Sequence, residues 1–445
     1  MLRSNDESLP GFARSIGRWA MTGLVINCII GSGIFGLPGE LNRLVKEASP
    51  IAMLAAGLLM ASIMAPAAEV ASQFSQPGGP YLYARRAFGR FVGLQIGWFS
   101  LLSSVAAGAT IANLFVVYLA GELPSAAHGL TRTIVLFGFV GIPAGINYFG
   151  VRKGAALSST LVVAKILPLA LIIGLGLGRF RLSFETIHVG EVLAPGWRNW
   201  LNALLLLMFA YQGFEYAIIP GGEVDNPRRT LPFALGAGLL VVVTVYSLLQ
   251  FVTLATIGTS TSARSVADTA THLIGPMGGI LTTVAVLIST GGANSSLMLD
   301  APRLMFSLAA EREFPSVLAR LHPRFHTPTL AIVIFALLVW LLAVSGGFFW
   351  LLAVTAAASM IMYISICAAL IQLRRLHPQA EALRVPFGPA LSVIGTIISL
   401  VLIAQLQLSQ ALLMIVTVLL ATANWCWSAR RLAKKSTSVT ACTDD

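Results

Sequence analysis

The sequence has little charge, few cysteines and none of the short motifs that mark ATP-driven or hydrolytic proteins. Only 11% of its 445 residues are charged, while 56% are hydrophobic, and a soluble domain of this size does not have that balance. Its four cysteines show neither metal-ligand spacing nor a disulfide framework. No Gly-x-x-x-x-Gly-Lys-Ser/Thr occurs, and the apolar segments hold no Ser-His, His-Glu-x-x-His or paired-aspartate arrangement. We therefore expect no enzyme, no bound metal and no other cofactor.

What the chain does have is a series of apolar segments of about 20 residues, the length that a helix needs to cross a bilayer. The first lacks a small-residue cleavage site, so we expect it to be a retained span rather than a signal peptide. The sequence predicts an all-α integral membrane protein with twelve transmembrane helices, at about residues 18–42, 50–74, 88–121, 132–150, 155–178, 199–223, 231–257, 277–308, 328–345, 348–373, 387–407 and 409–429.

The basic residues lie mostly on one side of these predicted helices. With the N-terminus inside, 21 of the 29 Lys and Arg residues fall on inner segments and seven on outer ones. Because positive residues favour the cytoplasmic side, both termini are expected in the cytoplasm. The net charge of +11 is then a topology signal and not a nucleic-acid surface. The predicted location is the plasma (bacterial inner) membrane, with the lipid bilayer around the helices.

The predicted helices divide into two groups of five and a final pair. An odd number of spans makes the second group start on the opposite side, so two halves with one fold would be inverted. We expect an N-terminal tail (1–15), a first five-helix repeat (16–178), an outer loop (179–198), a second five-helix inverted repeat (199–373), an inner loop (374–386), two peripheral helices (387–430) and a cytoplasmic tail (431–445).

The first helix of each half contains residues that interrupt a helix. Gly31, Gly33 and Gly36 lie close before Pro38 in one, and Gly213 lies at the centre of the other. The three glycines also match the dinucleotide fingerprint, but no strand precedes them. Close helix packing through small residues is the simpler alternative. Since unpaired backbone groups are costly in hydrocarbon, broken helices should line a cavity, and we predict a solute site at the membrane midplane.

The two breaks suit a solute that carries both charges. Amides at the start of one half-helix would face a carboxylate, and carbonyls at the end of the other would face an ammonium group. We therefore expect a zwitterionic amino acid, because a polyamine would need more acids than Glu215. The predicted substrate-binding residues lie at or beside the breaks: Ile29, Ser32, Gly33, Ile34, Phe209, Tyr211, Gln212, Gly213 and Phe214.

Four motifs, in order, resemble those of the amino acid–polyamine–organocation (APC) superfamily transporters, which have the leucine-transporter type of fold. The resemblance covers about residues 15–375. It implies that the Ser32 and Gly33 amides bind the substrate carboxylate, and that the carbonyls of Ile29, Phe209 and Gln212 bind its ammonium group. Asp300 departs from the family, whose members usually have an apolar or small residue there. The motifs are Gly31–Phe35; Gln76–Tyr83; Phe209–Glu215 with Glu223–Arg229; and Arg303–Arg312 with His322–Pro328.

Lys165 is the basic residue that lies in the middle of a predicted span, away from its ends. A charge at the centre of a membrane helix costs about 2.5–3.5 kcal/mol, and burial disfavours its charged form. A lysine that snorkels to water is the alternative, but Arg152 and Lys153 already mark the inner edge, ~18 Å away. The resemblance places this amine where sodium-coupled relatives bind a metal ion. We hypothesise that protonated Lys165 bridges the first helix and the Ser289–Thr290 region of the eighth.

Other polar residues could lie near the site. Glu215 is the second candidate for a proton site, with a structural hydrogen-bond acceptor as the alternative. Ser103 and Ser104 could face the substrate, although serines in membrane helices often bond to their own backbone. Asn294, with Ser289 and Thr290, completes the near-site candidates.

These observations predict a secondary active transporter of amino acids that works by alternating access, as a proton-coupled symporter with Lys165 as the proton-carrying residue. The alternative is an amino acid or amine (polyamine) antiporter. A channel or membrane sensor is less favoured, because no polar ring, filter loop or output domain is evident. The expected partners are an amino acid, protons and lipid. We expect no nucleic acid, and the sequence carries no signal of oligomeric state.

Overall fold

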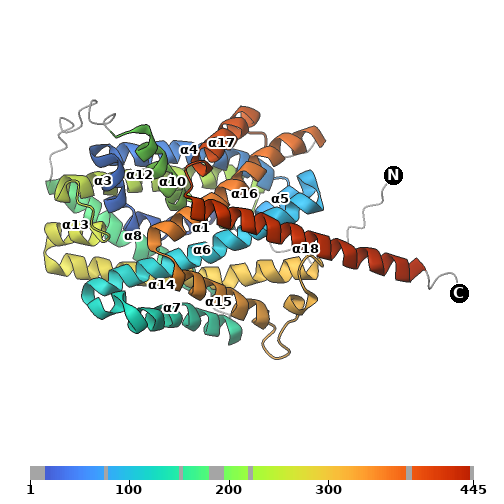
Figure 1. Cartoon of the computed structure of the whole chain (residues 1–445). Coiled ribbons are helices and arrows are strands. Elements are labelled where there is room, and N and C mark those ends of the chain that lie inside the picture. The colour runs from blue at the N-terminus through green and yellow to red at the C-terminus, as the bar shows by residue number, and fades with distance from the viewer. Residues whose placement is uncertain are drawn as a thin grey trace.

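The computed structural model describes residues 16–74, 79–149, 154–179, 195–218, 224–376 and 383–440. Within these ranges the chain is helical, and its one β-bridge is an isolated pair between Ile16 and Val224 (Figure 1). The predicted tail 1–15, most of the loop 179–198, much of the loop 374–386 and the last five residues lie outside the described ranges, as do Arg152, Lys153 and Glu223.

The helices follow the predicted order closely. Two short helices were not predicted, and each follows the second long helix of its half: α5 (Gly79–Phe88) and α13 (Ser265–Ile274). The first half otherwise consists of α1 (Arg18–Ile29), α2 (Gly33–Gly36), α3 (Pro38–Val45), α4 (Ser49–Ala71), α6 (Arg90–Glu122), α7 (Gly129–Phe149) and α8 (Gly154–Arg179). The second consists of α10 (Trp197–Tyr211), α11 (Phe214–Ala217), α12 (Pro227–Ile257), α14 (Pro276–Ala310), α15 (Thr329–Ser345) and α16 (Phe348–Leu376).

Two helices complete the chain, α17 (Gly388–Ile403) and α18 (Leu408–Thr440). α18 packs against α6 and α16 and then projects past the rest of the bundle (Figure 1). It continues to Thr440, into the segment that we expected to be a tail. The first five residues of that segment, Arg431 to Lys435, are good helix formers, which favours continuation of the helix past the predicted end.

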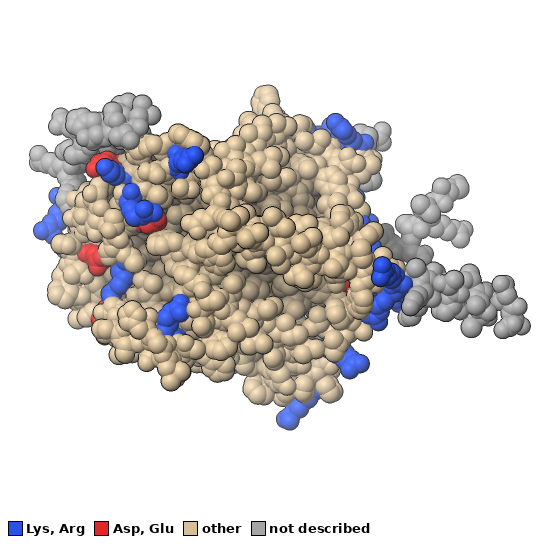
Figure 2. All heavy atoms as spheres, in the orientation of Figure 1, with Lys and Arg blue, Asp and Glu red and all other residues tan. Residues whose placement is uncertain are grey.

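The surface between the two ends of the bundle is apolar. Within the described residues, eight helices are long and apolar enough to cross a membrane, and α15 and α17 are apolar but shorter. Large side chains such as Leu58 and Leu130 are 74% exposed. Figure 2 shows Lys and Arg gathered toward the two ends of one face, with a broad uncharged band between them. Such a band belongs in hydrocarbon, so this is a multi-pass membrane protein; the count of twelve spans stays a prediction.

Both predicted helix breaks are present, and they contact each other. α1 ends at Ile29 and α2 begins at Gly33, while α10 ends at Tyr211 and α11 begins at Phe214. A Cβ atom added at Gly33 would lie 2.7 Å from the Ala210 Cα, and one at Gly213 would overlap the Cys28 carbonyl. Gly213 also has a φ of 113°, which favours glycine. Glycine is therefore required for the backbones to meet at the breaks.

The central helices hold the broken ones in place. α6 packs against α14, α15 and α16, while α1 and α4 pack against α12. The largest buried apolar cluster surrounds the breaks and includes residues from α1, α4, α10 and α12. Because this core is packed on several sides, the unwound residues are held between rigid helices.

Candidate functional site

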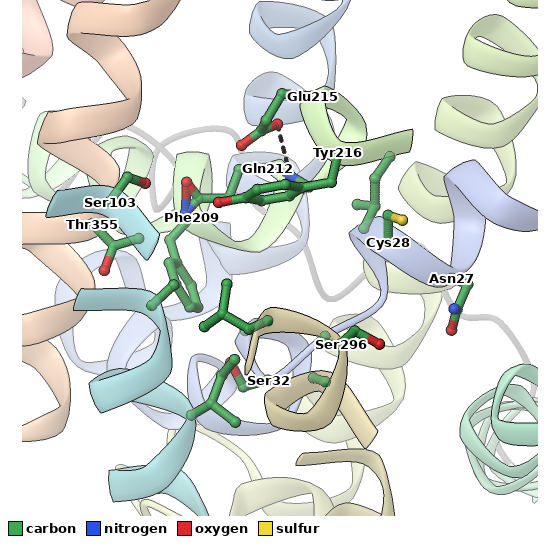
Figure 3. Close-up of a pocket in the computed structure, with 18 of the residues that line it drawn as sticks. Asn27, Cys28, Ser32, Ser103, Phe209, Gln212, Glu215, Tyr216, Ser296 and Thr355 are labelled. Carbon is green, nitrogen blue, oxygen red and sulfur yellow. Dashed lines mark hydrogen bonds between the residues drawn. The ribbon is translucent and has the colours of Figure 1, made fainter. Parts of the chain in front are cut away.

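A cavity of about 150 Å³ lies where the two breaks meet (Figure 3). Its walls come from α1, α6, α8, α10, α14 and α16 together with both unwound segments. The space is roughly ten times what one water molecule needs. Nine of the residues predicted from the sequence line it: Ile29, Ser32, Gly33, Ser103, Lys165, Phe209, Gln212, Gly213 and Glu215.

The other predicted residues lie outside the cavity lining. Ile34, Tyr211 and Phe214 are fully buried behind it. The Tyr211 hydroxyl donates a hydrogen bond to the Met53 carbonyl at 2.8 Å, and the Phe214 ring packs against Tyr363. These aromatic side chains therefore support the walls instead of facing the solute. The near-site candidates outside the lining are Ser104, Ser289, Thr290 and Asn294.

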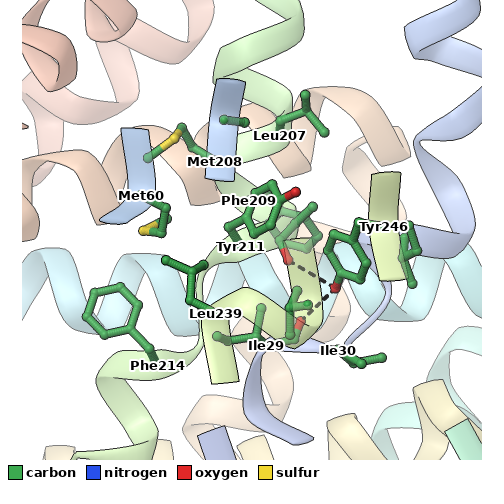
Figure 4. Packing of buried hydrophobic residues seen from close by; sticks show 14 of the residues in the cluster. Ile29, Ile30, Met60, Leu207, Met208, Phe209, Tyr211, Phe214, Leu239 and Tyr246 are labelled. Carbon is green, nitrogen blue, oxygen red and sulfur yellow. Dashed lines mark hydrogen bonds between the residues drawn. The ribbon is translucent and has the colours of Figure 1, made fainter. Parts of the chain in front are cut away.

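One tyrosine of α12 joins the ends of the two broken helices. The Tyr246 hydroxyl lies 3.1 Å from the Ile29 carbonyl oxygen and 3.2 Å from the Ala210 carbonyl oxygen (Figure 4). Both carbonyls belong to the last turn of a helix, where no intrahelical partner follows. The Ile29 carbonyl, which we predicted to bind an ammonium group, thus already accepts one hydrogen bond and keeps capacity for a second.

Glu215 holds the second break in shape. Its carboxylate accepts hydrogen bonds from the Gly213 amide at 2.9 Å (Figure 3) and from the Tyr363 hydroxyl at 3.0 Å. The side chain is 3% exposed. Two donors fix the carboxylate between α11 and α16, which is what the structural alternative for Glu215 requires. Its role in proton coupling stays a prediction.

A chain of polar side chains connects the same break to α6 and α16. The Ser359 hydroxyl donates to the Gln212 Oε1 at 2.6 Å and lies 2.9 Å from the Ser103 hydroxyl. The hydroxyl of Ser104, the next residue of α6, lies 3.1 Å from the Tyr216 hydroxyl. These bonds position the unwound Gln212 against the two central helices, so a movement of α6 or α16 would reach the cavity directly.

Lys165 is buried in the cavity wall and contacts the first helix. Its side chain is 4% exposed, and its Nζ donates to the Asn27 Oδ1 of α1 at 3.2 Å. The expected bridge to α14 is absent among the described contacts. The Thr290 hydroxyl bonds to the Val286 carbonyl of its own helix, and the Ser289 hydroxyl has no partner. Among the described residues, the structure thus shows the α1 end of the predicted bridge, through Asn27, and no bond from Lys165 to Ser289 or Thr290. The bridging role of Lys165 stays a prediction.

Sequence reasoning did not assign several of the cavity residues to the site. Asp300 was noted as a departure from the family, and it lines the cavity together with Ser296 and Leu297 of α14. These residues lie three and four positions apart, so they share one helix face. That spacing was the available signal. The remaining polar side chains that sequence reasoning did not assign to the site are Asn27, Cys28, Tyr216 and Thr355.

Ion pairs join the helices at both ends of the bundle. Arg374 makes two bonds to Glu69, at 2.6 and 2.7 Å, and Glu69 is 1% exposed. At the end predicted to be outer, Arg264 pairs with Glu122 at 3.0 Å, and both are partly exposed.

Comparison with known proteins finds similarity over most of the chain. A family model described as "Amino acid permease" matches residues 16–427. The "Serine/threonine exchanger SteT" of Bacillus subtilis is 28% identical over 398 residues, which cover 87% of this chain and 90% of that protein. The "Putative arginine/ornithine antiporter" of Escherichia coli is 28% identical over 335 residues, or 69% and 70%. An uncharacterized transporter of Mycobacterium tuberculosis is 26% identical over 323 residues, or 72% and 71%. The similarity spans the helical bundle and both breaks.

Proposed function

This chain belongs to the amino acid permease family, and from that premise we propose that it is a secondary transporter that carries an amino acid across the membrane by alternating access. The proposed substrate site is the cavity at the two breaks. Its support is the lining, in which unwound backbone from both halves meets Lys165 and Glu215. Alternating access follows from an inverted pair of halves that move around a fixed central site.

The backbone at the breaks supplies both kinds of partner for an amino acid. Ser32 and Gly33 lie where α2 begins, and amides at the start of a helix lack intrahelical acceptors. They would bind the substrate carboxylate. Carbonyls at the ends of α1 and α10 would bind the ammonium group, sharing the Ile29 oxygen with Tyr246. A zwitterionic amino acid has a carboxylate for the amides and an ammonium group for the carbonyls.

We propose proton-coupled symport through Lys165. The buried amine lies in the cavity wall and bonds to Asn27 on α1. Loss of its proton would weaken that bond and free α1 to move, since a neutral amine is the poorer donor to an amide oxygen. Exchange is the second candidate, because two relatives are named as an exchanger and an antiporter. In an exchanger Lys165 would have a structural role.

Purified full-length protein in liposomes tests the proposal. A panel of amino acids is first screened by thermal shift, since a ligand that binds only the folded state raises the melting temperature. Uptake of each hit is then measured with and without a pH gradient. No hit and no uptake of any amino acid would refute the transporter proposal itself.

Two variants test the coupling. Lys165→Met should abolish the stimulation of uptake by an acidic exterior, while the exposed Lys46→Met should leave it intact. Stimulation that persists in Lys165→Met would refute the proton role. Counterflow of labelled substrate without a pH gradient in the wild type, with no net uptake under a gradient, would establish exchange instead.

A further inference from the structure

Asp300 stands apart from the other charged residues of the cavity. It lies on the face of α14 that lines the cavity, four residues after Ser296, and both side chains are exposed. It makes no hydrogen bond or ion pair with any described residue. By contrast, Glu215 accepts two hydrogen bonds and Lys165 donates to Asn27. The carboxylate of Asp300 therefore faces the cavity without a partner.

The charges in the cavity wall sum to a negative value. Lys165, Glu215 and Asp300 are its charged residues, and their formal charges give a balance of −1. All three line the cavity together with Cys28, near the end of α1. A cleft with low-dielectric walls and a net charge concentrates ligands of the opposite sign. The space beside Asp300 thus favours a cation.

Neighbouring basic residues form no ion pair with Asp300 in the described part of the chain. Arg303, three residues further along α14, attracts the carboxylate electrostatically without forming an ion pair. Lys165 is bonded elsewhere and is 4% exposed. A ligand group that carries its own positive charge is the partner that this carboxylate lacks.

We propose that Asp300 determines substrate specificity by binding a positive charge at the end of the substrate's side chain. The transported amino acid would then be a cationic one, with a guanidinium or a second ammonium group. This inference rests on the proposed function, in which the backbone of the amino acid lies at the breaks. Cys28, Ser32 and Asp300 line the same cavity. A long side chain that extends from the breaks into this cavity therefore enters the space that Asp300 lines.

The experiment compares arginine with citrulline, which has nearly the same shape but no positive charge. Affinities are measured on purified full-length protein by calorimetry, with serine and threonine as short neutral ligands. Wild-type protein should bind arginine at least about tenfold more tightly than citrulline, a difference of about 1.4 kcal/mol. Asp300→Asn should remove that preference, and Asp300→Glu should retain it. Asp268→Asn, on α13 outside the cavity lining, is the matched control and should change nothing.

The outcomes separate this inference from the proposed function. Equal binding of arginine and citrulline by wild-type protein would refute the role of Asp300, whether or not the variants fold. Retained preference in Asp300→Asn would do the same. Tight binding of serine or threonine alone would refute the cationic substrate but support an amino acid transporter. Binding of none of these ligands, nor of any other amino acid, would refute the proposed function as well.

Discussion

Removal of the Tyr246 hydroxyl should destabilise the protein by separating the ends of its two broken helices. Tyr246→Phe keeps the ring, which is fully buried and whose centroid lies 5.2 Å from that of Tyr211. It removes the hydroxyl group that bonds to the carbonyls of Ile29 and Ala210. The packing of α12 against α1 stays as it is. The change therefore isolates a polar effect from a cavity effect.

The expected loss in free energy of unfolding follows from the hydrogen bonds that the two carbonyls no longer accept in Tyr246→Phe. Each lies in the last turn of a helix, where no intrahelical donor follows. An unsatisfied buried acceptor costs about 1–3 kcal/mol. Tyr211→Phe is the matched control, because its hydroxyl bonds to the Met53 carbonyl in the middle of α4. That carbonyl keeps its helical partner, so the control should cost only about 0.5–1.5 kcal/mol.

The assay is equilibrium unfolding in mixed micelles, followed by tryptophan fluorescence, on wild type and the two variants. We expect Tyr246→Phe to lower the free energy of unfolding by about 1–3 kcal/mol, and by more than Tyr211→Phe does. Saturating substrate should reduce the difference from wild type if its ammonium group bonds to the Ile29 carbonyl. Equal or smaller destabilisation in Tyr246→Phe than in Tyr211→Phe would show that the carbonyls find other donors, and the reasoning would fail.

Three further predictions concern the ion pairs and the cavity wall. Arg374→Met should lower stability by about 3–5 kcal/mol, because it leaves the buried Glu69 unpaired, and Glu69→Gln in the same chain should recover part of the loss. Glu122→Gln breaks the exposed pair with Arg264 and should change stability by less than about 1 kcal/mol; a larger loss would mean that the pair is desolvated. Cys28 lines the cavity, so a thiol reagent should inhibit uptake, substrate should slow the inhibition, and Cys28→Ser should abolish it. Unchanged inhibition in Cys28→Ser would place the reactive thiol elsewhere.

Local residue chemistry was enough to predict the breaks and much of the lining. Glycines and Pro38 cannot maintain an apolar helix, and hydrocarbon does not satisfy bare backbone groups, so the sequence located the unwound segments and nine lining residues. It did not separate residues that line the cavity from those behind it. Tyr211 and Phe214 lie beside the break in sequence, but the rotation of the adjoining helical turns directs them into the core.

The sequence by itself determined that this is an apolar, multiply spanning chain with two interrupted helices, because hydrophobic length and backbone breakers act locally. The partner of each polar side chain was decided only by the tertiary structure. Lys165 bonds to Asn27 and not to Ser289, Glu69 pairs with Arg374, and Asp300 faces the cavity. Such partners come from helices far apart in sequence, and the way those helices rotate and slide as they pack sets which groups meet.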